Sequence, residues 1–214
     1  MSLNLSIKLS SLSLRNPTVL ASGILGVSAS LARRVESAGA GAYTTKTITR
    51  KPRKGYSNPV FVELEHGYLN AIGLSNPGID YFKEELKKMK KSLEIPVILS
   101  IGGNTPEDFE YTAKAGVSMG VDALELNISC PHVKGVGLEI GDDIKLVKEI
   151  VKRVKAVAGG KPVFVKLSLH HRYVELAEAT LSAGADGLVA INTIRGIAID
   201  IYAKTPILSN IRGG

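Results

Sequence analysis

The 214-residue chain has no tryptophan, a single cysteine and few aromatic residues, 5% of the total. One cysteine excludes an internal disulfide framework and is typical of a reducing compartment. Every apolar run is shorter than the roughly 18 residues that span a bilayer. Residues 1–13 lack the apolar core and the cleavage site of a secretory signal. We therefore expect a protein that is neither secreted nor embedded in a membrane.

The charge is unbalanced, because 27 lysines and arginines face 20 acidic residues and leave a net charge of +7. Such a balance points to nucleic acid or to an anionic ligand as a partner. The densest basic segments are residues 50–54 and 87–91, and the second has the pattern of a solvated helix face. Since few aromatic rings are available to stack on bases, we interpret the charge mainly as surface solubility. Residues 50–54 could also steer an anionic small molecule.

Short apolar or β-branched segments alternate with longer helical patterns. We expect strands at residues 18–21, 42–45, 97–101, 123–126, 163–166 and 187–191, and helices at 28–38, 81–93, 105–115, 142–156 and 173–183. The start of the 105–115 helix is well marked, since Thr105 can cap it and Pro106 suits its first turn. Strands that alternate with helices are typical of parallel β/α units, so we predict an α/β fold.

Polar side chains follow the predicted strands. They are Ser22, Lys46, Thr47, Ser100, Asn127, Lys166, Asn192 and Thr193. This end of the strands is the active-site face of a β/α barrel, and it is also where an open doubly wound sheet binds its ligands. A dinucleotide-binding Rossmann unit is disfavoured, because no G-x-G-x-x-G pattern follows the first strand.

Residues 126–134, Leu-Asn-Ile-Ser-Cys-Pro-His-Val-Lys, resemble the class 1 dihydroorotate dehydrogenases, FMN-dependent (β/α)8 TIM-barrel enzymes of pyrimidine biosynthesis. The similarity begins near residue 14 and continues through 21–26, 46–49, 69–78, 165–168, 191–193 and 206–214. The 69–78 stretch looks more like class 1B than class 1A. The resemblance implies one FMN-binding barrel domain over residues 1–214 that oxidises dihydroorotate to orotate on the route to UMP.

The resemblance assigns the chemistry to three residues. Cys130 matches the general base of the family, although a lone cysteine can also be a small buried apolar residue. Lys46 matches the lysine that reaches both flavin and substrate, and Lys166 matches the one at the N1–O2 edge of the flavin. The alternative for either lysine is a surface side chain with its ammonium in water.

The resemblance also implies the remaining contacts. Asn70, Asn127 and Asn192 match the asparagines around the pyrimidine ring, whose amides suit alternating N–H and C=O groups, although Asn192 also fits a turn. The implied substrate-binding residues are Lys46, Asn70, Ala71, Ile72, Gly73, Leu74, Asn127, Asn192 and Thr193. The implied cofactor-binding residues are Ser22, Gly23, Lys46, Thr47, Ser100, Asn127, Lys166 and Ile191. We expect no metal site, because Cys130 and His132 supply only two of the four ligands of a structural zinc.

The sequence departs from the family pattern in four places, one of which is His170-His171, where Pro-Asn is common. His132 stands where the family often has asparagine, and Ser100 stands where many class 1B members have asparagine. About six β/α units are present, whereas a closed barrel has eight. In the family the last two units carry most of the contacts to the FMN phosphate, so a chain that ended at Gly214 is expected to bind FMN weakly.

The resemblance finally implies partners and a location. We expect a cytoplasmic homodimer and, for class 1B, a second subunit that carries FAD and an iron–sulfur cluster, with no membrane or nucleic-acid partner. One cysteine cannot hold such a cluster in this chain. Two alternatives stay open. One is another FMN barrel oxidoreductase acting on a reduced pyrimidine, such as a dihydropyrimidine dehydrogenase-like domain. The other is a basic, non-catalytic α/β protein that binds nucleic acid.

Overall fold

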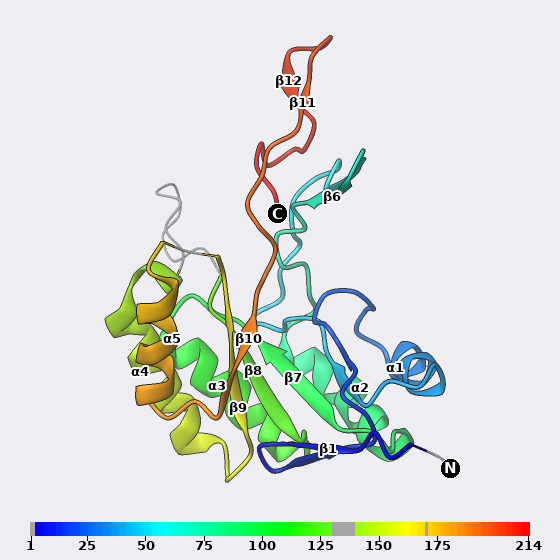
Figure 1. The fold of residues 1–214 in the computed structure, drawn as a ribbon, viewed down its shortest axis with the longest axis vertical. Helices are drawn as coiled ribbons and strands as arrows, with labels where there is room; N and C mark the ends of the chain where they lie inside the picture. Colours follow the sequence, from blue (N-terminus) through cyan, green and yellow to red (C-terminus); the bar gives the residue numbers. More distant parts are fainter. Residues whose placement is uncertain (1–2, 130–139, 170) are drawn as a thin grey trace.

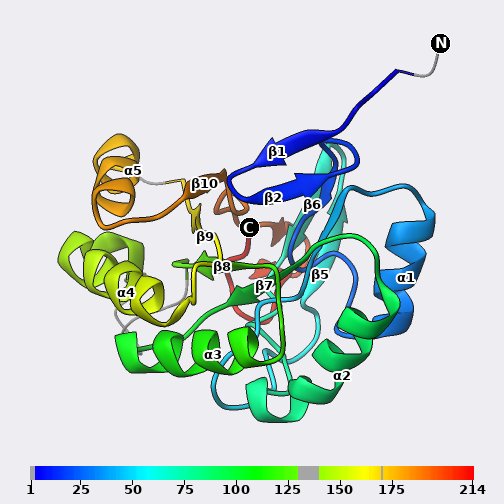
Figure 2. The same ribbon diagram turned by 90° about the horizontal axis from the view of Figure 1, so that it is seen from below.

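The computed structural model describes residues 3–129, 140–169 and 171–214. In this part of the chain six parallel strands form one sheet, in which strands that follow one another in the chain are neighbours. They are β3 (Val19–Leu20), β4 (Ala42–Thr44), β7 (Val97–Ile101), β8 (Ala123–Asn127), β9 (Val163–Leu167) and β10 (Gly187–Ala190). The sheet curls into a half-barrel, so the prediction of an incomplete β/α barrel is confirmed (Figure 2).

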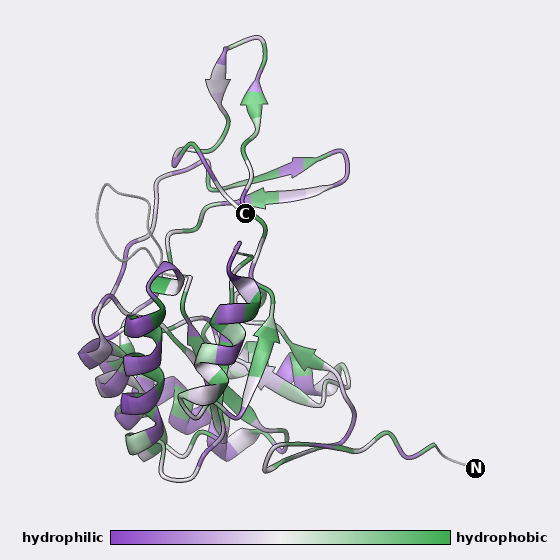
Figure 3. Ribbon diagram, turned by 60° about the vertical axis from the view of Figure 1, so that its left-hand side comes forward, coloured by the Kyte–Doolittle hydropathy of each residue, from purple (hydrophilic) through white to green (hydrophobic). Residues whose placement is uncertain are grey.

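Five helices cover the outer face of the described sheet (Figure 2). They are α1 (Ala29–Ser37), α2 (Ile79–Ser92), α3 (Pro106–Ser118), α4 (Ile144–Val157) and α5 (Tyr173–Ser182). The predicted cap of α3 is present, because the Thr105 side chain accepts a hydrogen bond from the amide of Asp108 at 3.3 Å. Hydrophilic residues colour the outward surfaces of the helices in Figure 3, as expected for amphipathic helices on a sheet.

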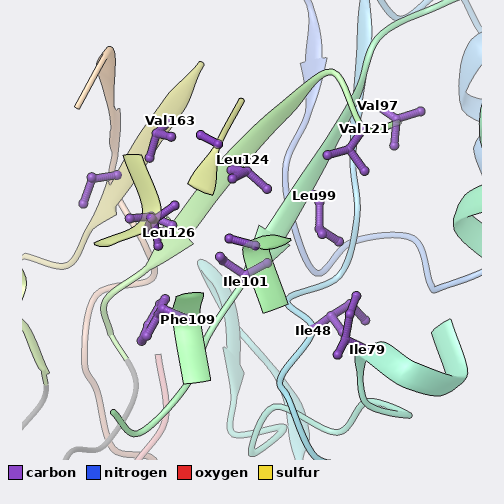
Figure 4. Close-up of a cluster of buried hydrophobic side chains, with 14 of the residues drawn as sticks. Ile48, Ile79, Val97, Leu99, Ile101, Phe109, Val121, Leu124, Leu126 and Val163 are labelled. Atoms are coloured by element: carbon purple, nitrogen blue, oxygen red, sulfur yellow. The ribbon is translucent and has the colours of Figure 1, made fainter. Parts of the chain in front are cut away.

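The main core fills the space between the sheet and these helices. Successive side chains of a strand point to opposite faces, so alternate residues of β7, β8 and β9 face the helices. They include Val97, Leu99, Ile101, Leu124, Leu126 and Val163, which pack with Phe109 of α3 (Figure 4). The residues between them therefore face the concave inside of the half-barrel, and it is these inward positions that build the candidate site.

Three hairpins were not predicted from the sequence. β1 (Ile7–Leu9) and β2 (Leu12–Leu14) lie at the amino-terminal end of the sheet, where Leu12 and Leu14 pack on Ile98, Ala123 and Phe164. β5 (Phe61–Leu64) with β6 (Gly67–Asn70), and β11 (Ile199–Asp200) with β12 (Thr205–Pro206), project beyond the carboxyl ends of the strands (Figure 1). A short 3₁₀ helix, Ile140–Asp142, precedes α4. The strands of these hairpins are so short that their period-2 pattern gives little signal.

Among the residues that the structure describes, no helix combines the length and the apolar character that a membrane crossing requires.

Candidate active site

A layer of polar side chains lies inside the half-barrel, at the inward positions near the carboxyl ends of three adjacent strands. Ser100 of β7, Glu125 and Asn127 of β8 and Lys166 of β9 are all buried. Below them the inward positions are apolar, since Ile98, Ala123 and Phe164 pack on the β1–β2 hairpin. The same strands thus provide an apolar floor and a polar layer above it. Buried polar groups are stabilised only where they find partners.

Hydroxyl and amide groups from four strand ends meet in this layer. The Thr47 Oγ1 lies 3.0 Å from the Ser100 Oγ and 3.4 Å from the Ser22 Oγ, and it accepts a hydrogen bond from the Asn127 Nδ2 at 3.1 Å. The loop after β4 is held in place because the Ile48 amide donates to the Ser100 carbonyl at 2.9 Å. Four of the predicted site residues, far apart in the chain, are therefore brought together.

Asn192 continues this network across the sheet. Its Nδ2 lies 3.4 Å from the Asn127 Oδ1 and 3.2 Å from the Ser129 Oγ, and its backbone amide donates to the Leu167 carbonyl at 2.8 Å. Its Oδ1 also accepts a hydrogen bond from the Thr193 amide at 2.9 Å, as expected for an asparagine in a turn. Asn192 therefore both shapes its turn and meets Asn127.

The site contains two lysines and one buried acid. In the described part of the chain, neither the Lys46 nor the Lys166 side chain has an ion-pair partner within 4.0 Å. Lys46 is partly buried, and this burial lowers its pKa below the ordinary value. Burial raises the pKa of Glu125, while the Lys166 charge and the Ser100 hydroxyl act in the opposite direction. A pair of cations without a paired carboxylate favours an anionic or electron-rich ligand.

The predicted substrate segment, residues 70–74, is held mainly by other loops. The Asn70 Nδ2 donates to the Gly214 carbonyl at 2.7 Å, and Ala71 packs in a small apolar cluster with Leu69 and Leu208. The Ile72 carbonyl accepts from the Tyr56 amide at 3.2 Å. Gly73 and Leu74 both have positive φ, of 73° and 54°. Within the described residues no hydrogen bond joins this segment to the Thr47–Asn127 network, so its contact with substrate stays a prediction.

Three further predicted residues lie at the edge of the site. Gly23 has a φ of +93°, and a Cβ added there would meet no atom within 4 Å, so its backbone borders open space. Ile191 and Thr193 are exposed beyond the end of β10. Cys130 and His132 lie outside the described residues, so the predicted base is not placed. The described residues contain no group of three or more His, Cys, Asp or Glu side chains that could hold a metal ion.

One residue of the site and one contact were missed in the sequence. Glu125 stands inside a strand that is buried along its whole length, and a charged residue at such a position was the available signal. Ser129 carries the missed contact, to Asn192. Its interaction depends on a turn between distant strands, and no local pattern indicates it.

A cavity of about 300 Å³ lies beside the site, between the loops after β4 and β7. Its lining comprises Thr49, Arg50, Lys51, Pro52, Arg53, Gly103, Asn104 and Asp108. Arg50, Lys51 and Arg53 of this lining belong to the basic segment 50–54, which could steer an anion. The Arg50 guanidinium, however, already lies 3.7 Å from the Asp108 carboxylate and 4.6 Å from the centre of the Tyr111 ring.

Comparisons with known proteins identify the family of the chain. The family model described as "Dihydroorotate dehydrogenase" matches residues 4–214. The chain is 50% identical over 211 residues to the "Dihydroorotate dehydrogenase B (NAD(+)), catalytic subunit" of Pyrococcus abyssi, which covers 98% of this chain and 69% of the relative. The protein of the same name from Methanocaldococcus jannaschii is 48% identical over 204 residues, or 94% of this chain and 66% of the relative. The chain thus spans about two thirds of the length of these relatives.

The fold is also found in a solved structure. The ligand-free DHODH crystal structure from Eimeria tenella matches with a TM-score of 0.77 at 22% identity, covering 89% of this chain and 62% of that one. At this identity the match supports the half-barrel fold alone. The match of the family model to nearly every residue, together with relatives at about half identity, shows that the chain belongs to the dihydroorotate dehydrogenase family.

Proposed function

We propose that this chain forms the FMN-binding catalytic domain of a B-type dihydroorotate dehydrogenase, which oxidises dihydroorotate to orotate in pyrimidine biosynthesis. The observation that carries the proposal is the family match over residues 4–214. The polar layer at the carboxyl ends of β7, β8 and β9 supports it, because this is where β/α barrels place their active sites.

The residues in this layer suit a flavin. Gly23 presents backbone to open space, so a flat ring system can approach closely. Lys46 and Lys166 supply positive charge that stabilises the negative charge of a reduced ring. Glu125 Oε1 is buried without a hydrogen-bond partner in the described structure, so the layer contains a polar atom that a bound ligand could contact. We assign Ser22, Gly23, Lys46, Thr47, Ser100, Asn127, Lys166 and Ile191 to the cofactor.

When bound, FMN supplies the redox chemistry by accepting a hydride from one carbon of the substrate. The protein supplies the base, and we assign this role to the Cys130 thiolate, which takes the proton from the adjacent carbon. Asn127 is oriented for its role, since its Nδ2 donates to Thr47 and its Oδ1 accepts from the Ser129 amide at 3.1 Å. We assign Asn70, Asn127, Asn192 and Thr193 to the substrate ring, with Lys46 beside both ligands and Ala71, Ile72, Gly73 and Leu74 as the wall.

The electrons leave through a separate protein in this proposal. The relatives are named as catalytic subunits of an enzyme that uses NAD(+), and such a name implies a second subunit. We propose that this partner carries FAD and an iron–sulfur cluster. A homodimer of the catalytic chain and a cytoplasmic location remain predictions that follow from the family resemblance.

An anaerobic absorption experiment tests the proposal. The purified chain is mixed with FMN, separated from free flavin, and its visible spectrum is recorded before and after dihydroorotate is added. We expect the flavin bands to bleach with dihydroorotate and to persist with dihydrouracil, which lacks the carboxylate. Bleaching by dihydrouracil alone would show that the substrate is a different reduced pyrimidine.

The Cys130→Ser variant tests the assigned base. We expect this variant to keep its flavin spectrum and to lose most of its turnover, because a serine hydroxyl is a much weaker base than a thiolate near neutral pH. An ordinary thiol has a pKa of about 8.5, so turnover of the parent chain should rise with pH. Full turnover by the variant would remove Cys130 from the mechanism.

A further inference from the structure

Tyr43 is the one tyrosine of seven that is buried, and the assigned reaction gives it no role. It lies in β4, where its ring packs in the main core between the sheet and the helices. A buried phenol needs a hydrogen-bond partner, whereas a phenylalanine would fill nearly the same space without that requirement. The partners of the hydroxyl therefore indicate what this tyrosine does.

The Tyr43 hydroxyl lies 3.1 Å from the Leu25 carbonyl oxygen and 3.2 Å from the Gly26 carbonyl oxygen. A hydroxyl has one proton, so the two carbonyls share it. Both belong to the loop that leaves β3 at residue 21 and ends at Val27, which packs on the main core. Burial raises the pKa of Tyr43 to about 12, so the hydroxyl keeps its proton and stays a donor over the ordinary pH range.

Few other contacts fix the middle of this loop. Ile24 is 68% exposed and Leu25 is 37% exposed, so apolar packing contributes little there. Among the described residues, the side chains that reach residues 21–27 through hydrogen bonds are Thr47 and Tyr43. The Thr47 contact, with the Ser22 hydroxyl, is long at 3.4 Å. The shorter contacts of Tyr43 therefore provide the firmer hold on the loop.

We propose that Tyr43 is a positioning residue, whose hydroxyl holds the loop after β3 in the conformation that directs Ser22 and Gly23 at the site. Glycine adopts many backbone conformations, so without an anchor the φ of +93° at Gly23 is one among several. A ligand would then have to order the loop as it binds, which lowers its affinity. The assignment of Ser22 and Gly23 to FMN rests on the proposed function, whereas the hold on the loop is a property of the chain itself.

The hold on the loop can be measured without any cofactor. The full chain is treated with chymotrypsin, which cuts after large apolar residues, and formation of the fragment 1–25 is followed by mass spectrometry. We expect Tyr43→Phe to speed this cleavage at least about threefold, because the loop loses the shared hydrogen bond.

Thr180→Val is the matched control. It removes a buried hydroxyl that donates to the Ala177 carbonyl at 2.8 Å, in the helix α5 at the opposite end of the sheet from α1 (Figure 2). Its rate of cleavage after Leu25 should equal that of the parent. The proposal is overturned if folded Tyr43→Phe is cut no faster than the parent, or if both variants are cut faster to the same extent, since a general loss of stability would then explain the change.

Two unnatural side chains separate the donated proton from the shape of the ring. Tyr43→4-aminophenylalanine keeps a donor at the end of the ring, so its cleavage rate should return toward that of the parent. Tyr43→4-fluorophenylalanine carries a substituent of similar size without a proton, and it replaces the phenylalanine variant if that chain does not fold. We expect the fluorinated chain to be cut as fast as Tyr43→Phe. Slow cleavage of the folded fluorinated chain would contradict a role for the proton.

Titration with FMN connects the loop to the site. We expect Tyr43→Phe to raise the Kd of FMN by about threefold or more. Turnover at saturating FMN and dihydroorotate should stay close to that of the parent, because the Tyr43 ring lies on the helix side of the sheet. Thr180→Val should change neither quantity.

The outcomes distinguish this inference from the proposed function. An unchanged Kd in folded Tyr43→Phe would overturn the positioning role while the proposed function stands. A parent chain that fails to bind FMN or to bleach with dihydroorotate would instead count against the proposed function, and the cleavage rates would still decide whether Tyr43 holds the loop.

Discussion

Asn76 joins the two loops that carry most of the predicted substrate contacts. Its Oδ1 accepts from the amides of Thr49 at 3.1 Å and Gly78 at 2.9 Å, and its Nδ2 donates to the Leu74 carbonyl at 2.7 Å. The side chain is buried, with 7% of its surface exposed. Thr49 follows the loop with Lys46, whereas Leu74 ends the 70–74 segment, so one amide links both loops.

The Asn76→Ala substitution removes these hydrogen bonds at once, together with the contact of the Asn76 amide with the Thr49 Oγ1 at 2.9 Å. Each buried polar group that loses its hydrogen bond costs about 1–3 kcal/mol, so we expect a loss of roughly 2–4 kcal/mol or more in the free energy of unfolding. For a chain of this size the melting temperature should fall by roughly 5–15 °C. Asn76→Asp keeps an acceptor for the amides of Thr49 and Gly78 but sets a buried carboxylate oxygen against the Leu74 carbonyl, so it should also be less stable than the parent.

Urea unfolding followed by circular dichroism measures these differences. Asn104→Ala is the matched control, because Asn104 is exposed and its side chain makes no hydrogen bond in the described structure, so its effect should stay within about 0.5 kcal/mol. The reasoning is refuted if Asn76→Ala is as stable as this control.

Three other predictions follow from single contacts. Burial lowers the pKa of Lys46 from 10.5, so as pH rises the folded chain loses this proton before the unfolded chain does. The parent should therefore gain stability relative to Lys46→Met as pH rises toward 10.5. Urea unfolding at about pH 8 and about pH 10 measures this difference, and a parent that loses stability relative to the variant would contradict it. The Asp122 carboxylate accepts from the Val97 amide at 2.7 Å, so Asp122→Ala should cost about 1–3 kcal/mol and speed hydrogen exchange at that amide; unchanged protection would contradict this. A Cβ on Gly213 would lie 2.4 Å from the Asn70 carbonyl oxygen, so Gly213→Ala should loosen residues 205–214 and speed their cleavage in limited proteolysis, and equal cleavage rates would argue against a tight contact.

The alternation of strands and helices was readable from the sequence because it is a local property. All six predicted parallel strands and all five predicted helices are present, with ends that differ by at most a few residues. The cap of α3 was also readable, since Thr105 accepts from an amide only three residues further along the chain. These features depend on neighbours within one turn or one strand, where residue type is decisive.

Contacts between distant residues were harder to predict. The three hairpins were missed, because their strands are only two to four residues long and give little period-2 signal. The resemblance assigned Thr47 and Asn127 to the site, but their mutual hydrogen bond joins residues 80 positions apart. The 70–74 segment likewise depends on residues near the end of the chain, since Asn70 bonds to Gly214.

The sequence by itself determined the α/β class, the order of the units and the family, because hydrophobic period, capping residues and short motifs are written locally. Only the tertiary structure decided which face of each strand lines the half-barrel and which polar groups meet there. Curling of the sheet places Ser100, Asn127 and Lys166 from successive strands in one buried layer. It also leaves Glu125 among them without a hydrogen-bond partner for its Oε1 in the described structure, a fact that depends on burial and on distances across strands.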